Sequence, residues 1–128
     1  MSREVIFTNK APKAIGPYSQ AIRSGDLLFV SGQIALDPRR DEMVTGGMKE
    51  EVDQIISNIK AILNVVGADL KDVVKSTIYL TDLSHFSAIN QEYGKYFPHN
   101  PPARSTVEVN RLPKGANIEI EVIAAVPK

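Results

Sequence analysis

The sequence predicts an α+β fold in which two amphipathic helices cover one face of a sheet of five or six strands. Six short apolar segments bounded by turn residues and two longer segments with helical spacing follow one another in the order β-β-β-α-β-α-β-β. Two helices can cover only one face of such a sheet, yet several strands carry apolar residues on both faces. Association of several copies of the chain is the simplest way to bury the second face.

Length and composition restrict the class of protein. A chain of 128 residues, 43% of them hydrophobic, can bury a substantial core, so we expect one domain over residues 1–128. Fifteen basic and fifteen acidic residues cancel, which argues against nucleic acid as the main partner. Cysteine is absent and only His85 and His99 offer imidazole ligands, so we expect no metal site. Without a signal pattern at Met1–Glu4 or a run of about 18 apolar residues, we expect a soluble cytoplasmic protein and no membrane partner.

The N-terminal third contains the first three predicted strands. Val5–Phe7 is a short apolar run typical of an edge strand, and the turn signal Ile15–Tyr18 follows it. Gln20–Arg23 and Leu27–Ile34 form a predicted hairpin about Gly25-Asp26. The charged stretch from Asp37 to Gly47 is interpreted as a solvated loop.

Both helices lie in the middle of the chain. Apolar residues at three- and four-residue intervals predict a helix from Met48 to Val66 that ends at Gly67 and packs on the sheet. After a strand over Asp72–Leu80, a second helix capped by Asp82 or Ser84 ends before Pro98. The last two strands are Ala103–Asn110 and Asn117–Val126.

Arg104 and Glu119 are the strongest candidates for chemistry, because each stands in apolar, β-branched surroundings where an unpaired charge is costly. An arginine fork can hold a small carboxylate through two hydrogen bonds, and a glutamate can activate water. The alternative interpretation is structural: an ion pair of Arg104 with Glu108 or Glu121, and a lysine partner for one of the two glutamates of the last strand. If the last two strands formed a simple hairpin, Glu119 would face Glu108 and Arg104 would lie about 13 Å along the ladder.

Several weaker candidates have ordinary structural explanations as well. Tyr18 after Gly-Pro is usually a packed ring, and Ser31-Gly32 at a strand end is usually a bulge, although a glycine there would let a ligand approach the backbone. Asn90 lies among apolar positions of the second helix, where backbone groups can satisfy its amide. No phosphate-binding loop or serine-hydrolase motif occurs.

Taken together, these segments resemble the RidA (YjgF) family of reactive imine deaminases along essentially the whole chain. The matching segments are Ala14–Ala21, Ser31–Ile34, Asn58–Ala68, Val73–Lys75, Asn90–Tyr93, Pro102–Ser105 with Val107, Leu112-Pro113 and Ile118–Glu121. The resemblance implies a chorismate-mutase-like fold with a six-stranded mixed sheet, and a homotrimer with three clefts between subunits. It also implies that the last two strands need not be neighbours. Arg104 and Glu119 then converge in one of two ways: through a different pairing of the strands, or with each supplied by a different subunit at an interface.

Carried over by position, the family's functional residues fall on Tyr18, Ser31, Gly32, Asn90, Arg104 and Glu119. Many members have cysteine where this chain has Thr106, and we expect the backbone amide there to matter more than the thiol. The implied activity is that of a 2-iminobutanoate/2-iminopropanoate deaminase, which hydrolyses 2-imino acids to 2-keto acids and ammonia without a cofactor. Two alternatives stay open: a non-catalytic trimer that binds small carboxylates or proteins, and an endoribonuclease or translation inhibitor.

Overall fold

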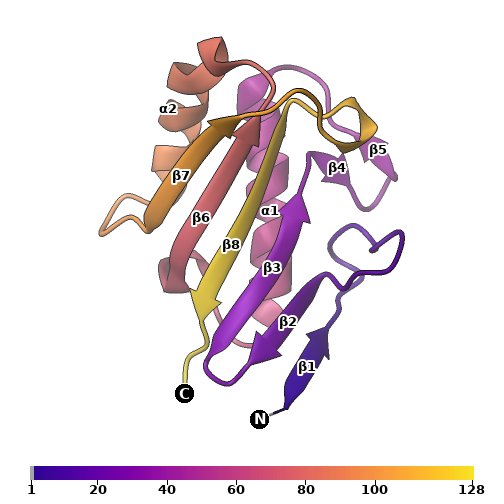
Figure 1. Ribbon diagram of the computed structural model, residues 1–128, viewed down its shortest axis with the longest axis vertical. Coiled ribbons are helices and arrows are strands. Elements are labelled where there is room, and N and C mark those ends of the chain that lie inside the picture. Colours follow the sequence, from indigo (N-terminus) through magenta and orange to yellow (C-terminus); the bar gives the residue numbers. More distant parts are fainter. Residues whose placement is uncertain (1) are drawn as a thin grey trace.

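A six-stranded sheet with both α-helices on one face is the main feature of the computed structural model, which describes residues 2–128 (Figure 1). The sheet has the order β1-β2-β3-β8-β6-β7 and is antiparallel except for the parallel pair β6–β7. The elements are β1 (Arg3–Ile6), β2 (Ala21–Ser24), β3 (Leu27–Gln33), α1 (Met48–Val65), β6 (Val73–Leu80), α2 (Phe86–Tyr96), β7 (Ala103–Glu108) and β8 (Ile118–Ala125). The predicted fold class and element order are confirmed.

Helix α1 supplies the centre of the core. Its apolar stripe is fully buried, with Val52, Ile55 and Ile59 each 0% exposed, and it packs on β3 and β8. The helix ends where Gly67 takes a left-handed conformation (φ 75°) and donates its N–H to the Asn64 carbonyl. Glycine adopts this conformation without steric cost, which explains why the predicted stop is confirmed.

Helix α2 is preceded by a 3₁₀ turn, Leu83–His85, that the sequence did not predict. Asp82 caps this turn by accepting a hydrogen bond from the Ser84 N–H, so of the two predicted caps only Asp82 acts, and it acts one turn early. The hydroxyl of Tyr96 donates to Asp53 of α1 at 2.6 Å, and the hydroxyls of Tyr93 and Ser76 bond at 2.7 Å. These bonds join α2 to α1 and to β6.

Strands β7 and β8 are not neighbours. The β6–α2–β7 connection is a parallel crossover that places β7 outside β6, and β8 pairs with the other edge of β6. The simple hairpin register between Glu108 and Glu119 is therefore wrong. Local sequence could not exclude it, because two strands joined by a short loop most often pair with each other.

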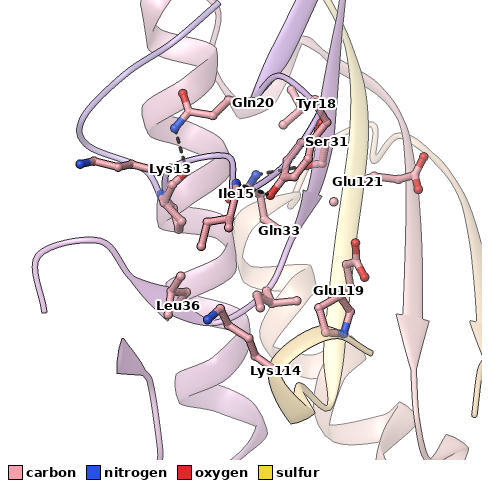
Figure 2. Close-up of a pocket in the computed structure, with 15 residues that line it drawn as sticks. Lys13, Ile15, Tyr18, Gln20, Ser31, Gln33, Leu36, Lys114, Glu119 and Glu121 are labelled. Atoms are coloured by element: carbon pink, nitrogen blue, oxygen red, sulfur yellow. Dashed lines mark hydrogen bonds between the residues drawn. The ribbon is translucent and has the colours of Figure 1, made fainter. Parts of the chain in front are cut away.

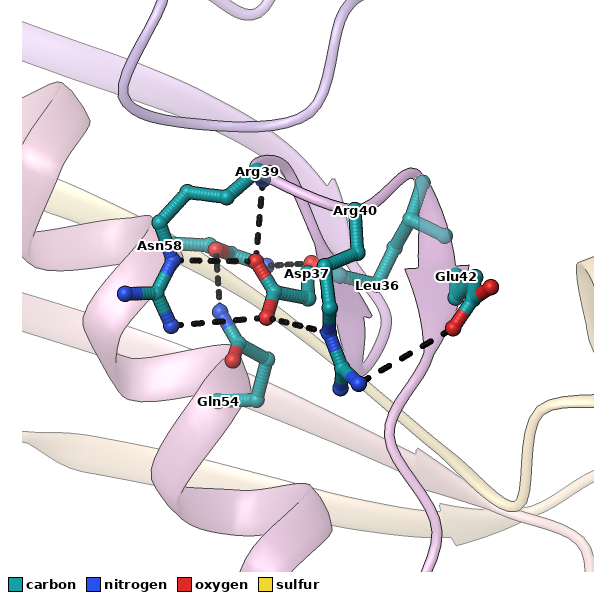
Figure 3. A network of polar contacts seen from close by, with 7 residues as sticks. All are labelled: Leu36, Asp37, Arg39, Arg40, Glu42, Gln54 and Asn58. Atoms are coloured by element: carbon teal, nitrogen blue, oxygen red, sulfur yellow. Dashed lines mark hydrogen bonds and ion pairs between the residues drawn. The ribbon is translucent and has the colours of Figure 1, made fainter.

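The charged segment after Asp37 is more ordered than a solvated loop. A two-stranded sheet, β4 (Leu36–Asp37) with β5 (Glu42–Met43), forms there, and Asp37 is only 3% exposed. Its carboxylate accepts the Arg39 backbone N–H at 2.9 Å. The same carboxylate faces the guanidinium groups of Arg39 and Arg40 (Figure 3). These bonds, with the Arg39 N–H first among them, lower the pKa of Asp37 below its ordinary value. The solvated-loop prediction is wrong for Asp37 because paired charges can be buried.

The helix-free face of the sheet carries exposed apolar side chains. Leu27, Phe29 and Val107 are 39%, 43% and 43% exposed, and each alternates with residues that face the helices. Exposed apolar side chains that lie on one open face of a sheet are typical of interaction surfaces.

Candidate functional site

A pocket of about 610 Å³ lies where β3 ends, beside β8 (Figure 2). Its walls come from the loop before β2, the end of β3, the segment to Leu36, the turn Pro113–Gly115 and β8. The polar side chains that line it are Lys13, Tyr18, Gln20, Ser31, Gln33, Lys114, Glu119 and Glu121.

The wall at the end of β3 is shaped by an irregularity in its pairing with β8, between Val30 and Gln33. The Ser31 hydroxyl donates to the Ser19 carbonyl at 2.6 Å, and its N–H donates to the Gln20 carbonyl at 2.9 Å. The predicted bulge is therefore present, and its serine is engaged with the chain's own backbone. This irregularity places the next residue, Gly32, in the pocket wall.

The loop before β2 is held by the buried amide of Gln20. Its Oε1 accepts the Thr8 N–H at 2.8 Å, and its Nε2 donates to the carbonyls of Thr8 at 3.0 Å and Pro12 at 2.8 Å. The loop carries Tyr18, which is 54% exposed at the pocket rim and whose hydroxyl accepts the Ile15 N–H at 3.4 Å. Tyr18 is thus a rim residue with a largely free ring.

Glu119 lies on the helix-free face of the sheet, beside Glu121 and opposite Tyr79 of β6. Burial raises the pKa of Glu119 above its ordinary value, and the charge of Glu121 raises it further. Among residues 2–128, neither glutamate has a lysine or arginine within ion-pair distance. The predicted lysine partner is not found, and Glu119 is a half-buried carboxylate with elevated basicity inside a pocket.

Arg104 lies on the opposite face of the sheet. Its partner in the parallel ladder is Ser76, which faces the helices, and its guanidinium carbon lies 5.0 Å from the ring centre of Tyr93 and 5.7 Å from that of Phe86. These rings of α2 hold the cation by cation–π attraction. In the part of the chain that the structure describes, Arg104 has no ion pair, so the predicted bridge to Glu108 or Glu121 is not formed.

Asn90 and Thr106 lie on the same side of the sheet as Arg104. Asn90 lies between Phe86 and Tyr93 on one stripe of α2, and its Oδ1 is buried without a hydrogen-bond partner. Thr106 follows Arg104 by two residues on the edge strand β7, so the two share a face. The backbone partner expected for the Asn90 oxygen is absent.

The seven predicted site residues therefore form two groups. Tyr18, Ser31, Gly32 and Glu119 line the pocket, and Asn90, Arg104 and Thr106 lie at the β7 edge on the other face. One copy of the chain does not bring them together. Sequence reasoning did not select the pocket residues Lys13, Gln33, Lys114 and Glu121. Only Glu121 carried a usable signal, because it shares a face with Glu119 by strand alternation.

Residues 2–128 contain neither a metal-binding cluster nor a membrane-spanning helix. No cluster of three or more histidine, aspartate or glutamate side chains could hold a metal ion in this range. Within the same residues, each helix is too short or too polar to cross a membrane.

Comparison with known proteins assigns the family. A family model described as Endoribonuclease L-PSP, which represents the YjgF/RidA proteins, matches residues 8–126. The chain belongs to this family. A RutC family protein of Pyrococcus abyssi is 56% identical over 97% of this chain and 98% of that protein. The human 2-iminobutanoate/2-iminopropanoate deaminase is 47% identical over 95% of this chain and 89% of that enzyme. The structure of E. coli TdcF with bound serine covers 95% of this YjgF/RidA chain and 98% of TdcF, with a TM-score of 0.89 at 39% identity.

Proposed function

We propose that this protein hydrolyses 2-imino acids to 2-keto acids and ammonia at sites shared between subunits of a homotrimer. The observation that carries the proposal is Glu119, a carboxylate of raised pKa in a pocket with Tyr18 and Ser31. A base of this kind suits water activation near neutral pH. The identity to the human deaminase supports the same reaction, and a relative with bound serine supports a ligand that carries a carboxylate.

We propose shared sites because the candidate residues lie on opposite faces of the sheet. Glu119 stands on the central strand β8, facing away from the helices, whereas Arg104 stands on the edge strand β7 and faces α2. The edge of one copy can meet the pocket of the next if copies pack through their helix-free faces. That packing would also bury the exposed Leu27, Phe29 and Val107.

In the proposed mechanism, Arg104 of one subunit binds the substrate carboxylate through its planar fork. Glu119 of the neighbouring subunit takes a proton from a water molecule, whose oxygen attacks C2 of the protonated imine. Glu119 then passes that proton to the nitrogen of the tetrahedral intermediate. The C–N bond breaks and ammonia leaves as the carboxylate of Glu119 takes the remaining hydroxyl proton and the carbonyl forms, and that proton finally passes to ammonia or solvent. Tyr18 closes the pocket, and the backbone amides at Gly32 and Thr106 position the substrate.

A coupled assay tests the reaction. A threonine dehydratase supplies the imine, semicarbazide traps it, and added protein should reduce the trapped amount. Arg104→Ala should lower the rate by roughly two decades or more, since losing a charged contact costs about 2–5 kcal/mol. Arg104→Lys should also be poor because a point charge does not replace the fork, and the exposed Arg111→Lys is the matched control. An unchanged amount of trapped imine would remove the deaminase proposal, and RNA cleavage that survived Arg104→Ala would favour the nuclease.

A separate experiment tests the trimer. Phe29→Asp places a charge on the helix-free face without touching the core residues Leu28 and Val30. Light scattering should then give the mass of a monomer or dimer, against a trimer for the natural chain. A natural chain that is monomeric at micromolar concentration would contradict shared sites.

A further inference from the structure

We propose that Gly32 is a positioning residue whose missing side chain leaves the space in which the Glu119 carboxylate rests. A Cβ atom placed on Gly32 would overlap Glu119 Oε2 and would lie 2.7 Å from its Cδ and 3.0 Å from its Cγ. Real Cβ atoms do not approach other heavy atoms this closely, so any larger residue at position 32 would displace the carboxylate. The inference rests on the proposed function only in taking Glu119 as the base.

The backbone gives no other reason for glycine at this position. Six glycines of the chain have left-handed backbones, among them Gly16 and Gly67, and there the side-chain-free residue serves the turn. Gly32 is not in the left-handed region, so its backbone conformation is one that other residues also adopt. The demand at Gly32 is therefore one of space, and the group that uses the space is the Glu119 carboxylate.

The close approach explains the electrostatic state of the base. With its carboxylate against the backbone of Gly32, Glu119 is half-buried, and burial is the main reason that its pKa is raised. A side chain at position 32 would push the carboxylate out toward solvent and toward a more ordinary pKa. Gly32 thus controls both the location and the basicity of Glu119.

Kinetics of three variants test this link. Gly32→Ala should lower kcat by about 10- to 100-fold, less than the roughly 10²–10⁴-fold that complete loss of a general base costs, because the carboxylate is displaced and not removed. Glu119→Asp withdraws the carboxylate by one methylene and should also lose activity. In the double variant, the shorter acid makes room for the new methyl group, so kcat should recover above that of Gly32→Ala. Gly94→Ala is the control, because a Cβ at Gly94 meets nothing within 4 Å.

A second readout does not depend on activity. Carbon-13 NMR titration of the Glu119 carboxyl should give a lower pKa in Gly32→Ala than in the natural chain, and an unchanged pKa in Gly94→Ala. If Gly32→Ala fails to fold, the double variant should fold again, since the overlap is with the longer glutamate. If the natural chain has no deaminase activity but Gly32→Ala still lowers the pKa of Glu119, the proposed function is wrong and this inference stands. An unchanged pKa in Gly32→Ala, or kcat losses that simply multiply in the double variant, would overturn it.

Discussion

Substitution of Gln20 should destabilise the protein more than substitution of most other polar residues, because its one buried side-chain amide makes hydrogen bonds to several backbone groups. In Gln20→Ala the Thr8 N–H and the carbonyls of Thr8 and Pro12 lose bonds of 2.8–3.0 Å. Each lost bond to a partly buried group costs about 1 kcal/mol, so the free energy of unfolding should fall by roughly 2–4 kcal/mol. A domain of this size has only about 5–15 kcal/mol in total.

Urea unfolding at a fixed protein concentration measures the change, with an unchanged m value. Gln54→Ala is the matched control, because the Gln54 amide makes one bond, to Asn58 at 2.9 Å, and should cost about 1 kcal/mol. Gln20→Glu should resemble Gln20→Ala, since a carboxylate accepts from Thr8 but donates nothing to Pro12. The reasoning is refuted if Gln20→Ala is no less stable than Gln54→Ala.

Two further predictions concern single residues at the pocket. The pKa of Glu119 is raised in the folded state, so this group favours folding only in its protonated form. Its contribution to stability is fully present below its unfolded pKa of about 4 and is lost as the pH rises through the folded pKa. Glu119→Gln should therefore unfold at higher urea concentration than the natural chain at pH 7, and this advantage should shrink toward pH 4; a less stable variant at pH 7 would contradict the sign. Lys114 has a left-handed backbone (φ 57°), which asparagine tolerates better, so Lys114→Asn should raise the melting temperature by a few degrees, corresponding to at most about 1 kcal/mol. Lys13→Asn serves as its control, and a lower melting temperature for Lys114→Asn alone would argue against backbone strain there.

Features that depend on local order were predictable from sequence. The stripe from Val52 to Ile62 repeats with helical spacing, and Gly67 marks its end, so α1 was placed within one or two residues. Alternation also gave the correct grouping of Arg104 with Thr106 and Glu108 on one face of β7. These features are set by neighbours in sequence, and the physics that fixes them is short-ranged.

Features that depend on distant pairing were not predictable in this way. Whether Arg104 and Glu119 share a face depends on β6 lying between their strands, and no residue of β7 or β8 encodes that insertion by itself. The burial of Asp37 was missed for a different reason: its partners Arg39 and Arg40 are close in sequence, but a charged stretch alone does not show that the turn folds them back onto the carboxylate. The space at Gly32 is occupied by the side chain of Glu119, which is far along the chain. The local sequence around Gly32 therefore does not reveal why a glycine is needed there.

The central position of β8 has a consequence for how the protein is made. Of the six strands in the sheet, β8 is synthesised last, yet it separates β3 from β6 and pairs with both. Until residues 118–125 leave the ribosome, the nascent chain holds two half-sheets with open inner edges, and such edges are prone to pair wrongly. Completion of the sheet is therefore a late, long-range step, and translation that stops short of Ile118 should yield chains that chaperones and proteases recognise as unfinished.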